Sequence, residues 1–189
     1  VGSEMCIRDR IWDKNFGGNL DDIGEGIVET ENNTFVVAAS TFSYGTKGDA
    51  LLLKIDSDEN LIWQKTYGSD KQDQVRDVDG NTVSGRHLTQ TPDGGLLVSG
   101  YTRSYAKQPD NPYCVNKQVI VKYTICHGNT DMWVFKTDNS GTLLWNYAYP
   151  TDNEDTAFSA KQNSDGSVII SRMTAYLKTD KVGFSNSPF

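Results

Sequence analysis

Three tryptophans mark the start of units that share one residue pattern. Each tryptophan follows an aliphatic residue and begins an alternating run that ends in an aromatic residue and a turn, in the strings IWDKNFGG, IWQKTYGS and LWNYAYPT. These residues are Trp12, Trp63 and Trp145. Aspartates recur ten positions after each tryptophan, seven before the next tryptophan, and seven before that, at Asp22, Asp73, Asp155, Asp56, Asp138, Asp49 and Asp131. Agreement at three offsets indicates an internal repeat, which constrains the fold more than any other feature.

The two repeat periods differ in length, and the difference can be located. The period is 51 from Trp12 to Trp63 and 82 from Trp63 to Trp145, so the second unit is longer by 31. The turns at Asn32-Asn33 and Asp165-Gly166 share an offset of 20 from their tryptophans, whereas Asp93-Gly94 has an offset of 30. We therefore place ten extra residues between Asp73 and Thr91, and the other 21 between about Ser104 and Thr130. Repeats tolerate such insertions in loops because the stacked core is unaffected.

Within the units the hydrophobic pattern recurs every two residues, which is typical of β-strands. Asn, Asp and Gly residues separate the alternating runs and predict tight turns. A helix over Asp21 to Glu31 is the alternative at one place, because Leu20, Ile23 and Ile27 also have helical spacing. The predicted strands are Glu25 to Thr30, Thr34 to Thr41, Asp49 to Ile55, Leu61 to Tyr67, His87 to Thr91, Gly95 to Thr102, Met132 to Thr137, Leu143 to Tyr149, Ala157 to Gln162 and Ser167 to Thr174.

A four-stranded unit of about 50 residues, repeated in tandem, is typical of a β-propeller blade. We predict an all-β fold: a partial β-propeller of about three and a half four-stranded antiparallel blades, with a long hairpin-like insertion in the second. In such a fold a tryptophan fills the wedge between neighbouring sheets, and the repeated Asp and Gly residues form turns. Closed propellers have four to eight blades, so we expect the remaining blades in the rest of the same chain.

Several segments carry a resemblance to a known family. DNSGTLLWNYAY, DSDENLIWQKTYGS with GDALLLKID before it, and TPDGGLLVSGYT resemble the repeats of secreted bacterial β-propeller proteins, whose consensus is close to GDxWLxKxDxxGxxxWxKxxGGxxxD and TxDGGxxxxGxTxS. The resemblance covers Ile11 to about Thr174. It implies an extracellular or cell-surface location, with the periplasm as the alternative, and in that family a type IX sorting domain often accompanies the repeats. Glu59-Asn60 and Pro150 depart from the consensus turn glycines.

Two other propeller motifs match less of the sequence. An Asp-box, S-x-D-x-G-x-x-W, is half matched by Asp58, but Asn60 replaces its glycine. The docking motif of quinoproteins ends in G-x-x-x-W, which Gly141 and Trp145 satisfy, but its preceding Asp sits one residue further away than Asp138 does. A quinoprotein-like scaffold therefore stays as an alternative.

The first ten residues, VGSEMCIRDR, match an in-frame translation of a transposon-type sequencing adapter. We therefore expect residues 1–10 to be an adapter artefact of metagenomic origin. Residues 11–189 are then an incomplete propeller domain, with blade units near 11–61, 62–143 and 144–189. Setting Cys6 aside leaves two of the three cysteines.

Composition argues against two classes of partner. The formal charge is −7 and no Lys/Arg cluster is present, so the sequence lacks the basic surface that nucleic-acid binding needs. The longest purely apolar runs, such as Phe35 to Ala39, are about five residues, whereas a membrane-spanning helix needs roughly 20. We expect neither nucleic-acid binding nor membrane insertion, and look instead to a protein or glycan partner at a surface.

The long insertion holds a cysteine pair. Cys114 and Cys126 lie twelve positions apart, and a disulfide between them would stabilise this excursion by about 3 kcal/mol on the loop-entropy model. We favour this disulfide, which fits an oxidising compartment. Two free thiols are one alternative, and a metal site that includes His127 is another, although the spacing lacks a C-x-x-C element.

Other candidate ligand sites have weaker support. Asp77, Asp79 and Asn81 alternate oxygen-bearing side chains as calcium loops do, but lack the bidentate Glu and the glycine placement of an EF-hand. A solvated turn is the favoured interpretation, so we expect no cofactor, with calcium at this loop as the alternative. His87 has no G-x-S-x-G or HExxH setting, so no catalytic or zinc-binding histidine is predicted. The repeated aspartates are interpreted as turn and cap residues, because an active site normally breaks the symmetry of a repeat.

The long insertion is the part of the chain that is not repeated, so we expect a specific ligand surface there. It and its start hold Arg103, Tyr105, Tyr113 and Tyr123, and aromatic rings beside a cation suit a sugar face or a protein partner. An extended hairpin packed on its own blade is the alternative. We expect a non-enzymatic secreted or cell-surface module for adhesion, scaffolding or ligand binding. The alternatives are a fragment of a glycan-active propeller enzyme and a quinoprotein-like periplasmic scaffold, so enzyme activity stays open with a non-enzymatic role favoured.

Overall fold

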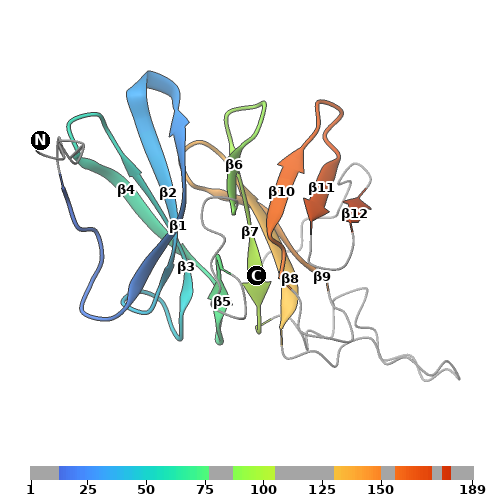
Figure 1. Ribbon diagram of the computed structural model, residues 1–189, viewed down its shortest axis with the longest axis horizontal. Coiled ribbons are helices and arrows are strands. Elements are labelled where there is room, and N and C mark those ends of the chain that lie inside the picture. The colour runs from blue at the N-terminus through green and yellow to red at the C-terminus, as the bar shows by residue number, and fades with distance from the viewer. Residues whose placement is uncertain (1–12, 77–86, 105–129, 150–155, 172–175, 180–189) are drawn as a thin grey trace, which may run out of the picture.

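The computed structural model describes residues 13–76, 87–104, 130–149, 156–171 and 176–179, the last as backbone only. Its strands form three antiparallel sheets, which confirms the predicted all-β antiparallel class. The sheets stand side by side in chain order, and the described strands do not close into a ring (Figure 1).

The sheets are named by their place in the chain. The first joins β1 Asp22–Thr30, β2 Thr34–Thr41, β3 Asp49–Ile55 and β4 Leu61–Tyr67, with the 3-10 turn η1 Glu31–Asn33 after β1. In the second, β5 Asp73–Gln74 and β6 Leu88–Gln90 both pair with β7 Leu96–Thr102, followed by β8 Asp131–Thr137 and β9 Leu143–Tyr149. The third joins β10 Ser159–Gln162, β11 Val168–Ser171 and β12 Tyr176–Thr179. Trp63 and Trp145 lie in the last strands of their sheets. A sequence unit that begins at a tryptophan therefore starts with the last strand of one sheet and continues into the next sheet.

Most predicted strands are present at their predicted places. The bounds of β2, β3, β4 and β9 agree with the prediction at both ends. The alternative helix over Asp21 to Glu31 is wrong, because this segment is β1 and pairs with β2 along its length. Two strands were not predicted: β5 is two residues long, too short to show an alternating pattern, and β12 lies beyond the last predicted strand, Ser167 to Thr174.

Neighbouring sheets share apolar layers. The layer between the first and second sheets is built from Val36, Ala38, Ala50 and Leu52 on one side and Leu96, Val98, Trp133 and Phe135 on the other. The layer between the second and third contains Leu97, Met132 and Val134 opposite Ala160, Val168 and Ile170. Because side chains alternate across a strand, the second sheet is apolar on both faces and is stabilised only with a neighbour on each.

The far face of the first sheet is apolar as well. Its buried residues are Ala39, Leu51, Leu53 and Ile55, with Phe16 and Phe35 packed against them. The first sheet therefore has the same two-faced character as the second, and its β2 and β3 read as near-continuous hydrophobic runs for that reason.

Trp63 and Trp145 occupy equivalent places. Each pairs with a lysine of the preceding strand, Lys54 or Lys136, next to a β-bulge in the same register. Trp63 packs against the layer between the first and second sheets, and Trp145 against the layer between the second and third. Trp12, the first tryptophan of the repeat, lies outside the described residues.

The register of the strands locates both insertions. Asp22 pairs with Thr41 in the first sheet as Asp73 pairs with Thr102 in the second, and Thr41 and Thr102 in turn pair with Asp49 and Asp131. Equivalent residues of the two sheets therefore differ in number by 51 for Asp22 and Asp73, by 61 for Thr41 and Thr102, and by 82 for Asp49 and Asp131. Ten extra residues therefore fall before β7 and 21 between β7 and β8, which agrees with the placement predicted from the turns.

A substitution at Gly141, in the turn between β8 and β9, tests the contact between the first two sheets. Gly141 has a φ of +78°, and a Cβ placed on it would lie 3.0 Å from the Trp63 ring. Gly166 has a φ of +86° with nothing within 4 Å of such a Cβ. Both Gly→Ala changes should cost about 1 kcal/mol in backbone strain, and Gly141→Ala should cost roughly 1 kcal/mol more through Trp63. Urea unfolding measures both, and equal losses would mean that Trp63 does not contact this turn.

Glu59 stands where its counterpart turn has a glycine. Its φ is 65°, and both turns make the same backbone hydrogen bonds, Glu59 N–H to Asp56 O and Gly141 N–H to Asp138 O. A glycine tolerates this left-handed conformation at no steric cost. Glu59→Gly should therefore raise the free energy of unfolding by about 0.5–1 kcal/mol. Asp58→Gly, one residue earlier in the same turn, is the control and should give no gain.

Candidate functional site

One polar row crosses each of the first two sheets at the same end. In the first sheet it consists of Asp22, Thr41 and Asp49, and in the second of Asp73, Thr102 and Asp131. Asp49, Asp73 and Asp131 are buried. The third member of the repeat, Asp155, lies outside the described residues.

Hydrogen bonds in the row are repeated atom by atom. The hydroxyl of Thr41 donates to Asp22 Oδ1, and that of Ser43 donates to Asp22 Oδ2 at 2.7 Å. In the second sheet Thr102 donates to Asp73 Oδ1 and Ser104 to Asp73 Oδ2 at 2.6 Å. Although burial acts to raise it, these bonds and the N–H of Gly18 hold the pKa of Asp22 below its usual value. The aspartates of the row therefore hold neighbouring strands together at one end of each sheet.

The aspartates at the opposite end of the sheets are also turn residues. Asp56 Oδ1 accepts hydrogen bonds from the N–H groups of Asp58 and Asn60, at 2.9 and 2.8 Å. Asp138 Oδ1 accepts equivalent bonds from Ser140 and Thr142. The N–H of Asn60 contributes most to holding the pKa of Asp56 below its usual range, and the hydroxyl of Ser140, which also donates to Asp138 Oδ1, contributes most to lowering the pKa of Asp138. Each of these aspartates thus closes a tight turn.

One position of the first strand of the sheet breaks the repeat. Glu25 is the extra residue of a β-bulge in β1, and Arg76 takes its place three residues after Asp73, as Glu25 follows Asp22. His87 then takes the place of Gly26. Ser99 is the counterpart of Ala38, and its N–H donates to His87 O, just as Ala38 pairs with Gly26. In the sequence, residues 77–86 are therefore the ten-residue insertion, since they separate Arg76 and His87, the counterparts of Glu25 and Gly26. Bulges commonly re-aim a side chain next to a functional site.

Glu25 is a buried carboxyl in that bulge. It is 1 % exposed, and neither of its carboxyl oxygens has a hydrogen-bond partner among the described residues. Burial raises the pKa of Glu25 to about 7, against the opposing positive charge of Arg76. Burial also raises the pKa of Asp49 to about 6, with the N–H of Thr46 acting against it and the charge of Asp73 adding to it.

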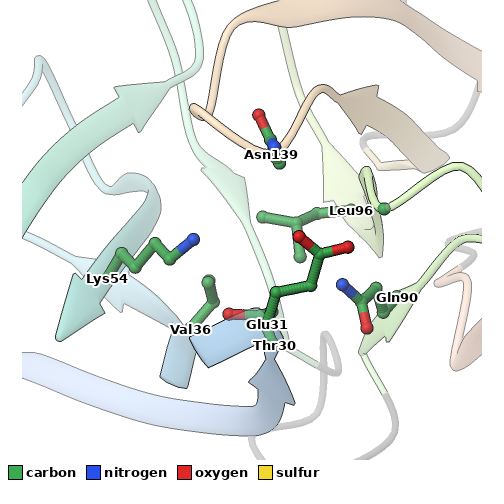
Figure 2. A pocket seen from close by; sticks show the side chains of 8 residues that line it. Thr30, Glu31, Val36, Lys54, Gln90, Leu96 and Asn139 are labelled. Atoms are coloured by element: carbon green, nitrogen blue, oxygen red, sulfur yellow. The ribbon is translucent and has the colours of Figure 1, made fainter. Parts of the chain in front are cut away.

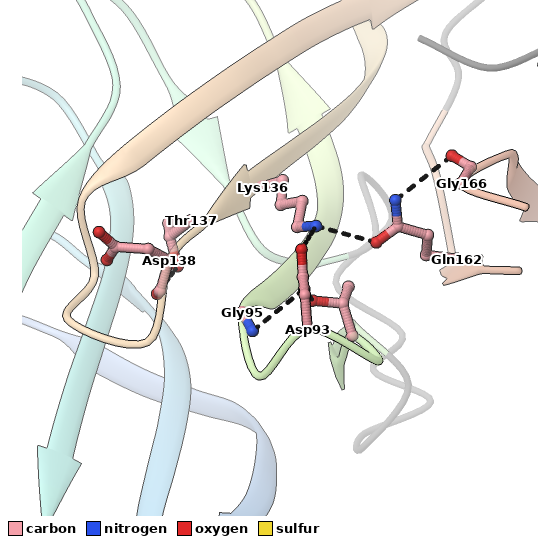
Figure 3. A network of polar contacts seen from close by, with 8 residues as sticks. Asp93, Gly95, Lys136, Thr137, Asp138, Gln162 and Gly166 are labelled. Carbon is pink, nitrogen blue, oxygen red and sulfur yellow. Dashed lines mark hydrogen bonds and ion pairs between the residues drawn. The ribbon is translucent and has the colours of Figure 1, made fainter. Parts of the chain in front are cut away.

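A lysine clamp joins the second and third sheets. Lys136 is 5 % exposed, and its Nζ lies 2.5 Å from Asp93 Oδ2 and 2.9 Å from Gln162 Oε1 (Figure 3). The bonds from Lys136 and Thr91 lower the pKa of Asp93 to about 2. Asp93 belongs to the turn before β7 and Gln162 ends β10, so one ammonium group bridges two sheets.

The equivalent position between the first two sheets is an open pocket. Lys54 has the register of Lys136, and Gln90 has that of Gln162. Figure 2 shows Lys54 and Gln90 on opposite sides of this pocket, with the carboxylate of Glu31 between them. Within the described part of the chain, the side chain of Lys54 makes no hydrogen bond or ion pair, although its backbone belongs to the β3 ladder. The cavity volume of this pocket is about 20 Å³, far below the roughly 300 Å³ of a small-molecule site.

The remaining predicted site residues are placed as follows. Arg103 lies over the Tyr101 ring at 5.8 Å and donates to Gln72 at 2.6 Å, which ties it to its own sheet. His87 is buried, with Nδ1 3.1 Å from the carbonyl oxygen of Ser99. The other predicted residues lie outside the described residues: Asp77, Asp79, Asn81, Tyr105, Tyr113, Cys114, Tyr123, Cys126 and His127.

Sequence reasoning missed the lysines and Glu25. A signal for the lysines exists, because a lysine stands two residues before Asp56 and before Asp138, and Lys178 has the same register in the third sheet. No comparable signal marks Glu25, whose importance comes from a bulge that periodicity does not reveal.

Comparison with known proteins adds no relatives: no family model matches the chain, and no curated protein matches its sequence. No helix in the described ranges has the length and apolar character to cross a membrane. Among the same residues, no three His, Cys, Asp or Glu side chains are grouped to hold a metal ion.

The raised carboxyl pKa values predict how stability depends on pH. Glu25 and Asp49 ionise more easily unfolded than folded, so stability should fall as pH rises from their ordinary pKa values of 4.5 and 3.8 toward the raised values of about 7 and 6, and should level off above them. Glu25→Gln removes one of these groups and should reduce the difference in stability between pH 5 and pH 8 by about 2 kcal/mol.

Urea unfolding at the two pH values measures this difference. Glu29→Gln, an exposed position on the same strand, is the control and should leave it unchanged. A Glu25→Gln protein with the pH dependence of the unmodified chain would show that Glu25 ionises freely in the folded state.

Proposed function

We propose that the chain forms successive blades of a β-propeller that serves as a non-enzymatic binding or scaffolding module. The observation that carries this proposal is the repeated register of the first two sheets, with the same Asp-Thr-Asp row, the same bulged tryptophan hairpin and the same lysine position. A sheet that is apolar on both faces is suited to a stack of like sheets around an axis.

The use of polar groups favours binding over catalysis. Asp22, Asp73, Asp56 and Asp138 are engaged in the same cap and turn hydrogen bonds in two copies, so their chemistry is structural. What differs between copies is the Lys54 pocket and the Glu25 bulge. Variation at fixed places on a repeated scaffold is typical of repeat proteins that bind partners.

A glycan-active enzyme is the second candidate, and Glu25 is the observation that favours it. Two carboxyl groups in different environments are the requirement for glycoside hydrolysis. Glu25 is unrepeated, with a raised pKa, but Asp49 is repeated at Asp131, and Glu25 is 1 % exposed. A substrate reaches such a carboxyl only if the surrounding chain moves, so the binding role is preferred.

The proposed location is outside the cell or at its surface, with the periplasm as the alternative. This rests on the resemblance of the repeats to secreted bacterial propeller proteins and on the Cys114 and Cys126 pair. A free-thiol assay of the protein before and after reduction tests the predicted disulfide. A disulfide would support an oxidising compartment.

The role is tested by offering the chain soluble polysaccharides and measuring both binding and released reducing ends. We expect no reducing ends above those seen with Glu25→Gln, with or without saturable binding to a polysaccharide. Turnover that Glu25→Gln abolishes would contradict the proposal and establish the glycan-active alternative.

A further inference from the structure

The pocket at Lys54 lacks the turn aspartate that completes the lysine clamp at Lys136. At Lys136 the ammonium group is held by the carboxylate of Asp93, in the turn of its own sheet, and by the amide oxygen of Gln162 in the next sheet. At Lys54 the next sheet supplies Gln90 in the register of Gln162. The residue equivalent to Asp93 is Asn32, which has no charge to offer.

The local turn explains why the first sheet does not close its own clamp. Asn32 and Asn33 have φ values of 62° and 54°, a pair of left-handed residues that asparagine tolerates better than most. Asp93 has no such conformation and is followed by Gly94 at +81°. The two turns therefore differ in backbone as well as in charge.

The pocket offers donors suited to a carboxylate. Lys54 supplies a positive charge, and the side-chain amides of Gln90 and Asn139, which also line it, are potential N–H donors. The cavity volume of about 20 Å³ has room for about one small polar group. A carboxylate fits only as the tip of a longer group, which is how Asp93 enters the Lys136 clamp.

We propose that the Lys54 pocket binds the carboxylate of an Asp or Glu side chain from an exposed loop of a protein partner. The equivalent site of this same chain indicates the chemical group, because Asp93 is a turn aspartate whose carboxylate lies 2.5 Å from the ammonium group of a lysine of this register. This inference rests on the proposed binding function and adds the chemistry that the partner must present.

Glu31 is the internal competitor. Its side chain is exposed, and its carboxylate lies in the pocket between Lys54 and Gln90 without an ion pair to Lys54 (Figure 2). A negative charge here opposes the entry of a second one. A partner's carboxylate must displace it, so removing the charge of Glu31 should tighten binding.

The experiment is a titration of the ¹⁵N-labelled full chain with the blocked peptide acetyl-Gly-Ser-Asp-Gly-Ser-amide, followed by backbone amide shifts. We expect saturable shifts at Lys54, Gln90 and Asn139. The same peptide with Asn in place of Asp is the control ligand and should give none.

Variants separate the pocket from general electrostatics. Lys54→Gln should weaken binding at least tenfold, and Glu31→Gln should tighten it severalfold. Lys47→Gln removes an exposed lysine at the other end of the first sheet and should change little. Unchanged spectra for the variants away from the substituted residue show that each is folded.

Three results would overturn the proposal: no saturable shift with either the unmodified chain or Glu31→Gln, equal binding of the Asn peptide, or equal weakening by Lys47→Gln and Lys54→Gln. None of them bears on polysaccharide turnover, so the proposed non-enzymatic role and this site fail independently.

Discussion

The packing of two-faced sheets against one another is the constraint on which the rest of the structure depends. Leu97 and Val134 of the second sheet point to one neighbour while Val98 and Phe135 point to the other. A strand that is apolar at every position is stable only when both faces are covered. The sheets therefore stack, and each unit of the repeat requires the next.

Stacking also explains where the polar chemistry lies. Because both faces are apolar, the polar rows, the aspartate turns and the lysine clamp lie at the ends of strands or in the seams between sheets, and Glu25 in the β1 bulge is the exception. The Asp-Thr-Asp rows occupy one end, the Asx turns the other, and the clamp of Lys136 a seam. A buried charge is tolerated there because it is paired, as Lys136 is with Asp93. Between the first and second sheets, Lys54 has no ion pair among the described residues that is equivalent to that of Lys136 with Asp93.

The sequence alone predicted most of the architecture and little of the site. Alternation and turn residues located β2, β3, β4 and β9 with their bounds, because long half-exposed or fully apolar strands carry a strong pattern. Lys54 and Glu25 were missed for different physical reasons. The clamp depends on a contact between sheets distant in sequence, and the buried state of Glu25 depends on a bulge that shifts register by one residue. Neither is visible in local periodicity.

The contact between Tyr67 and Phe135 tests the stacking most directly. Tyr67 ends β4 of the first sheet and Phe135 lies in β8 of the second, with ring centroids 4.8 Å apart, and the Tyr67 hydroxyl donates to Gly141 O at 2.6 Å. Nuclear Overhauser spectra of the full chain should show cross-peaks between the two rings. Cross-peaks within each sheet, with none between Tyr67 and Phe135, would contradict the account.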